Sequence, residues 1–104
     1  MTLLEGPILG FAMLGMTHYV DIGNADPAVI YYANASTAHM TLPDGPTLSG
    51  DLTLGPSGYF VDWIDGPEGD WQIARQGATL IYLNGYGEPS GEILRIVPGN
   101  AEGF

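Results

Sequence analysis

Cysteine and lysine are both absent from this chain, and each absence removes a class of function. Without cysteine there is no disulfide bond, no thiolate nucleophile and no cysteine-ligated metal site. Arg75 and Arg95 are the only strongly basic side chains, against 12 acidic ones, and the formal net charge is −10. Nucleic acids and anionic membranes are bound through clustered cations, so we expect neither partner. A cationic partner, a metal ion or a neutral apolar ligand fits this charge.

The chain also lacks a long hydrophobic run. Its longest apolar segment is Pro7–Met16, which is shorter than the ~20 residues that a membrane-spanning helix needs. No positive charge precedes this segment, as a signal peptide would require, and we therefore expect a cytoplasmic protein. An exposed apolar run recruits a partner. We expect the segment to be buried, either as a strand of its own barrel or against the second subunit of a homodimer.

Glycine and proline, by contrast, are abundant, with 16 and 8 residues. From residue 47 onward, clusters of Gly, Pro, Asn and Asp recur about every eight to twelve positions, and each cluster favours a turn. Hydrophobic and polar residues alternate between the turns. In Thr47–Leu54, for example, Leu48, Leu52 and Leu54 share one face. This period of two predicts strands.

The expected strands account for most of the chain. They are Ala28–Ala33, Thr37–Leu42, Thr47–Leu54, Tyr59–Ile64, Trp71–Arg75, Ala78–Leu83 and Glu92–Val97. A short helical turn near residues 26–33 is an alternative, because Pro27 suits the first position of a helix. About six to eight short antiparallel strands predict an all-β fold, a small barrel or barrel-like sandwich, in a single domain over residues 1–104. Closure into a barrel is favoured because no lysine protects the sheet edges.

Three titratable side chains are candidates for catalytic residues. His18 and His39 are candidates because histidine titrates nearest to neutral pH. Asp62 is a candidate because alternation places it on the same side as Phe60 and Ile64, and a carboxylate among apolar groups can serve as an acid or a base. A purely structural role is the alternative for each of the three.

Aromatic residues are the candidates for ligand contact. A barrel holds a small apolar molecule in a pocket lined by aromatic side chains and a few polar groups, although core packing uses the same residues. The candidates are Tyr19, Tyr32, Trp63, Trp71 and Tyr82. The sequence contains no phosphate-binding or serine-hydrolase motif, and no cofactor is predicted.

These observations support three hypotheses about function. The first is a small-molecule-binding barrel for an apolar molecule, acting as a carrier or as an enzyme that shapes its substrate for cyclisation or isomerisation. The second is a non-enzymatic protein-interaction or assembly module. The third is a metal-dependent barrel using His18 and His39, although a catalytic metal usually has a third protein ligand. A cavity of about 300 Å³ or more favours the first, and a filled interior with an exposed apolar patch favours the second.

Overall fold

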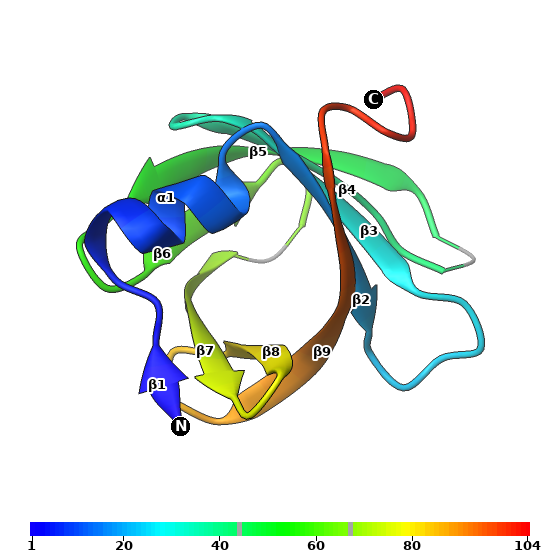
Figure 1. Ribbon diagram of the computed structural model, residues 1–104. Helices are drawn as coiled ribbons and strands as arrows, with labels where there is room; N and C mark the ends of the chain where they lie inside the picture. Colours follow the sequence, from blue (N-terminus) through cyan, green and yellow to red (C-terminus); the bar gives the residue numbers. More distant parts are fainter. Residues whose placement is uncertain (44, 67) are drawn as a thin grey trace.

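A computed structural model describes residues 1–43, 45–66 and 68–104 and shows a barrel of short antiparallel strands (Figure 1). Its elements are β1 (Thr2–Leu3), α1 (Gly6–Met13), β2 (Met16–Asp21), β3 (Ala28–Asn34), β4 (Thr37–Thr41), β5 (Thr47–Leu54), β6 (Tyr59–Trp63), β7 (Glu68–Gln76), β8 (Thr79–Leu83) and β9 (Pro89–Pro98). All seven expected strands are present, as β3 to β9. The all-β barrel prediction is confirmed.

The strands from β2 to β9 form an up-and-down meander that closes on itself. Each pairs antiparallel with the next in sequence, and β9 returns to pair with β2, with Met16 opposite Pro98 and His18 opposite Ile96. The two-residue strand β1 is an addition, since it pairs with β7. Closure gives each of the eight strands a partner on both sides. This is how the barrel avoids unprotected edges without lysine.

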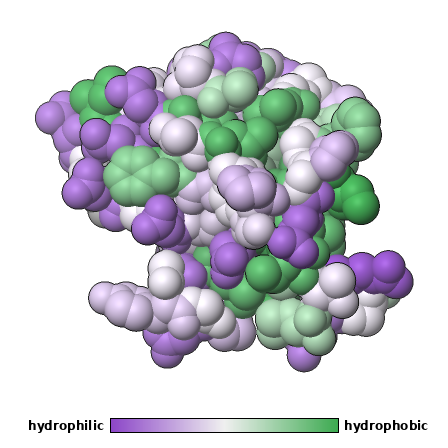
Figure 2. Space-filling view, turned by 90° about the vertical axis from the view of Figure 1, so that its left-hand side faces the viewer, coloured by the Kyte–Doolittle hydropathy of each residue, from purple (hydrophilic) through white to green (hydrophobic). Residues whose placement is uncertain are grey.

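The segment Pro7–Met16 is not a strand of the barrel, as one version of our expectation held. Its first part is helix α1, in which Leu9 and Met13 lie four residues apart and are fully buried against the end of the barrel. On the other side of the helix, Ile8 is 64% exposed and Phe11 is 78% exposed. Figure 2 shows the face that carries α1, where apolar side chains lie among polar ones. The segment is therefore only half buried within the chain itself.

The helical turn considered near residues 26–33 is also wrong, since residues 28–34 form β3 and pair with both β2 and β4. The β-branched and aromatic side chains of that segment suit the sheet better than a helix. Within residues 1–43, 45–66 and 68–104, no helix is long and apolar enough to cross a membrane.

The interior of the barrel follows the predicted alternation in β6. Tyr59, Val61 and Trp63 are buried, whereas Asp62 is exposed on the outer face. Opposite Trp63 in the register stands Gly50 of β5. A Cβ atom at Gly50 would lie only 2.8 Å from Cε3 of Trp63 and 3.0 Å from the carbonyl oxygen of Asp62. Glycine at this position therefore makes room for the indole.

Candidate functional site

The barrel is only partly filled by its own side chains. A cavity of about 250 Å³ lies inside it, lined mostly by aliphatic and aromatic residues of β2 to β8. It reaches the surface, because Ile22 and Ser90 line it and are themselves exposed. Its volume exceeds the ~150 Å³ of an apolar cavity that holds benzene, and it approaches the ~300 Å³ of typical ligand pockets.

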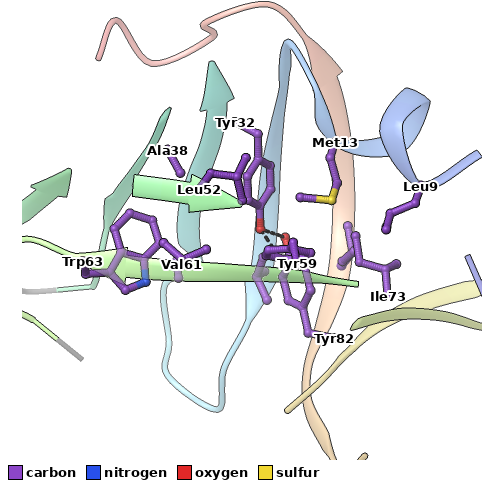
Figure 3. Close-up of a cluster of buried hydrophobic side chains, with 13 residues drawn as sticks. Leu9, Met13, Tyr32, Ala38, Leu52, Tyr59, Val61, Trp63, Ile73 and Tyr82 are labelled. Carbon is purple, nitrogen blue, oxygen red and sulfur yellow. Dashed lines mark hydrogen bonds between the residues drawn. The ribbon is translucent and has the colours of Figure 1, made fainter. Parts of the chain in front are cut away.

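Three tyrosines from three strands bring their hydroxyl groups together at the cavity (Figure 3). Tyr32 of β3 lies at the centre, with its hydroxyl oxygen 2.8 Å from that of Tyr59 and 3.1 Å from that of Tyr82. The rings of Tyr32 and Tyr59 also meet edge to face, with centroids 5.6 Å apart. We call Tyr32, Tyr59 and Tyr82 the tyrosine cluster. It provides polar groups in a cavity whose other lining side chains are mostly apolar.

His18 extends this cluster toward α1. The Tyr82 hydroxyl lies 2.5 Å from Nδ1 of His18, and Nε2 of His18 lies 2.6 Å from the carbonyl oxygen of Ala12. The imidazole is fully buried, stacked on Tyr82 and edge-on to Tyr32. A continuous hydrogen-bonded chain therefore runs from the last turn of α1 through His18 to the cavity.

His18 and the three tyrosines of this hydrogen-bonded chain are uncharged at neutral pH. Desolvation lowers the pKa of His18 to about 4, although its hydrogen bond to Ala12 opposes that shift. Desolvation also raises the pKa of Tyr32 to about 12, and it raises the pKa values of Tyr59 and Tyr82 well above their ordinary range. The site therefore offers neutral hydrogen-bonding groups rather than a charged acid or base.

The two tryptophans complete the aromatic wall of the cavity. Trp63 is buried at the end of β6, and Trp71 is partly buried on β7, where its ring meets Tyr82 at a centroid distance of 6.4 Å. Both line the cavity. Because indole fluorescence responds to nearby groups, these residues also provide a signal for ligand binding.

The candidate residues therefore divide into two groups. The structure brings together His18, Tyr32, Trp63, Trp71 and Tyr82, which line the cavity or contact its tyrosine cluster. Tyr19, His39 and Asp62 are not part of this arrangement.

The outer-face residues have their own neighbours. Tyr19 donates a 2.5 Å hydrogen bond to Glu102, and the guanidinium of Arg95 lies 4.2 Å from the centre of its ring. His39 stacks against Tyr31 and Phe104, with centroids 6.2 Å and 5.8 Å away. These contacts hold the C-terminal segment against the outside of the barrel. They give Tyr19 and His39 no access to the cavity.

The surroundings of Asp62 differ from the apolar environment that its neighbours in the sequence suggested. The apolar residues on its side of β6, Phe60 and Ile64, lie on the outside of the barrel, where Ile64 is exposed. Asp62 is itself exposed and stands opposite Asp51 on one side and Glu68 on the other. The carboxylate of Asp62 therefore faces solvent among other acidic side chains instead of an apolar pocket.

The two histidines of the metal hypothesis lie on opposite faces of the sheet. His18 pairs across β2 and β3 with Ile30, and Ile30 pairs with Met40 of β4, so His18 and Met40 share the inner face. His39 precedes Met40 and therefore points outward. Among the described residues, no three histidine or carboxylate side chains lie where they could hold a metal ion.

Tyr59 and the Ala12 carbonyl are members of the site that the sequence did not indicate. Alternation placed Tyr59 on the inner face with Val61 and Trp63, and that signal would have been enough to include it. No local signal pointed to Ala12.

No protein-family model matches the chain, and comparison with curated proteins and with solved structures found no match. The barrel and its cavity are therefore the basis for inferring a function.

Proposed function

We propose that this protein binds a small, neutral, largely apolar molecule inside the barrel. The observation that carries the proposal is the cavity of about 250 Å³, which is lined by apolar side chains and has the tyrosine cluster as its main polar feature. Burying apolar ligand surface contributes roughly 25 cal/mol per Å² to binding, and the apolar lining of this cavity can bury such a surface. A charged ligand would lose its hydration without gaining a counter-charge from the cluster.

Quenching of the fluorescence of Trp63 and Trp71 tests this proposal directly. Naphthalene is a suitable first probe, because a bicyclic ring suits a cavity larger than one that holds benzene. We expect saturable quenching in the parent protein. Ala28 lines the cavity and is buried, so Ala28→Phe should fill it and weaken binding about ten-fold or more. The matched control is Thr53→Phe, at an exposed position of β5. Equal binding by both variants, or no saturable binding by the parent, would contradict the proposal.

A catalytic version of the same function is an enzyme that folds a flexible substrate for cyclisation or isomerisation. The uncharged state of His18 and the tyrosine cluster favours reactions that develop little charge, in which proximity and exclusion of water provide the acceleration. A neutral, achiral triene that cyclises spontaneously to a racemic product is the probe. Catalysis inside a chiral cavity should give an enantiomeric excess that Ala28→Phe abolishes. A racemic product at the uncatalysed rate would remove the catalytic version and leave binding intact.

The alternative function, a protein-interaction or assembly module, is favoured by the exposed side of α1. Ile8 and Phe11 present apolar surface there although the inner side of the same helix is buried. We propose a second copy of this chain as the partner, which would make the protein a homodimer. Light scattering of the parent and of Phe11→Asp tests this proposal. A monomeric parent would remove it.

A further inference from the structure

The hydrogen bonds around His18 have a fixed direction. A backbone carbonyl only accepts, so the 2.6 Å contact with the Ala12 oxygen requires the proton of the neutral imidazole to sit on Nε2. Nδ1 then carries a lone pair and accepts. The hydroxyl that faces it at 2.5 Å, that of Tyr82, must be the donor.

The direction of the hydrogen bond between Tyr82 and His18 also fixes which hydroxyl donates in each hydrogen bond of the tyrosine cluster. A phenol has a single proton, and that of Tyr82 is used on His18. The Tyr82 oxygen then accepts the 3.1 Å hydrogen bond that Tyr32 donates. Since the proton of Tyr32 is now used as well, Tyr59 is the donor in the 2.8 Å contact between Tyr59 and Tyr32. All three hydroxyl protons are used in hydrogen bonds within the cluster or to His18, and only oxygen lone pairs remain for a ligand.

Three other polar side chains line the cavity wall, and of these Ser90, exposed at the opening, is the one whose hydroxyl can also accept a ligand's proton. The indole N–H groups of Trp63 and Trp71 are donors only. A ligand with a hydroxyl group can donate to the tyrosine cluster. A ketone or ether of the same size brings another acceptor to a group of acceptors, and its oxygen would lose its hydration at the cluster without gaining a partner there.

We propose that the ligand is an apolar molecule with a hydroxyl group, that the tyrosine cluster accepts the hydroxyl proton, and that His18 sets this preference without lining the cavity. This inference rests on the proposed function, because it names the chemical class of the molecule in the same cavity. It makes His18 a positioning residue that acts through Tyr82.

Three probes of one ring system test the proposal, namely 2-naphthol, 2-methoxynaphthalene and 2-methylnaphthalene. Dissociation constants are measured at neutral pH from tryptophan quenching. We expect the parent protein to bind 2-naphthol about ten-fold more tightly than 2-methoxynaphthalene, the size of effect that one satisfied hydrogen bond and one unsatisfied oxygen produce together. The methyl compound reports the apolar contribution alone.

Two variants test whether His18 fixes the direction of the hydrogen bonds in the tyrosine cluster. In Tyr82→Phe and in His18→Leu this direction is no longer fixed, so Tyr32 can donate to Tyr59 and Tyr59 can donate to the ligand. The preference for 2-naphthol should then fall to within about two-fold. In Tyr59→Phe the preference should remain, because the lone pair of Tyr32 becomes the end of the chain. Tyr86→Phe, at a side chain that is 90% exposed, is the control and should leave all three constants unchanged.

The outcomes distinguish this inference from the function on which it rests. If all three probes bind and 2-naphthol has no advantage over 2-methoxynaphthalene, the inference is wrong and the apolar cavity stands. If none binds, the proposed function itself fails. A preference that survives in Tyr82→Phe refutes the role of direction, whether or not His18→Leu folds by circular dichroism.

Discussion

Acidification should destabilise this protein through His18 in a predictable window. The folded pKa of His18 is about 4, against an ordinary value of 6.5. Because the folded state holds the neutral imidazole, the contribution of His18 to the free energy of unfolding is at its maximum above pH 6.5. The free energy of unfolding decreases as the pH falls toward 4, since the unfolded protein then binds a proton at His18 that the folded protein does not bind.

The magnitude follows from the size of the shift. A difference of about 2.5 pKa units corresponds to about 3.4 kcal/mol at full protonation, at 1.36 kcal/mol per unit. Between about pH 7.5 and 4.5 the loss is about 2.5 kcal/mol, because the folded histidine is then still mostly neutral. The imidazole is fully buried, so solvent does not screen this term.

Urea unfolding at several pH values measures this loss, with His18→Phe as the reference that shares every carboxyl group with the parent. The free energy of unfolding of the parent should fall by about 2.5 kcal/mol more than that of the variant over this range. The chain has two histidines, so a proton NMR titration compared with His39→Gln gives the pKa of His18 directly, even if His18→Phe does not fold. A His18 resonance that titrates near pH 6.5, or parallel stability curves, would refute the reasoning.

Three further predictions concern the core and the surface charge. Trp63→Ala should cost about 3–5 kcal/mol by denaturant midpoint, because the indole is buried on the inner face of β6; an unchanged midpoint would place it outside. Gly50→Ala should cost about 1–3 kcal/mol and shift tryptophan emission, since its Cβ would press on Trp63; an unaltered spectrum and midpoint would contradict the contact. Binding to DNA or RNA should be undetectable by anisotropy at physiological salt, given the net charge of −10; tight binding that weakens as salt rises would overturn that argument.

From Thr47 onward, turn residues mark the ends of β5 to β9, and alternation assigned the inner positions of β6 correctly. The strand β8 is apolar on both faces and was recognised by the turns that flank it. The strand β2 was missed because both of its faces are covered. His18 and Val20 face the core, while Thr17 is buried on the other side, where its hydroxyl donates a 2.7 Å hydrogen bond to the Gly99 carbonyl. A strand covered on both faces shows no alternation.

Helix α1 and the site were harder to predict for physical reasons. A helix of eight residues that buries only Leu9 and Met13 contains too few repeats to reveal its period. The pairing of His18 with Tyr82 joins residues 64 positions apart, so no local spacing indicates it. Asp62 was placed on the correct face of β6, but apolar neighbours on the outside of a strand do not show whether they form a pocket.

The docking of α1 and the polarity of the cavity depend on the same side chain. Ala12 lies in the last turn of α1, where backbone carbonyls have no partner within the helix. His18 supplies that partner through Nε2, and this bond fixes the tautomer that directs the tyrosine cluster. Leu9 and Met13 also hold the helix, by apolar burial in the same core cluster as Tyr32, Tyr59 and Tyr82, but this contact has no direction. If the proposed ligand binds at the tyrosine cluster, the hydrogen bonds of His18 would couple it to the position of α1, in addition to the apolar contacts that the helix makes in the same core cluster.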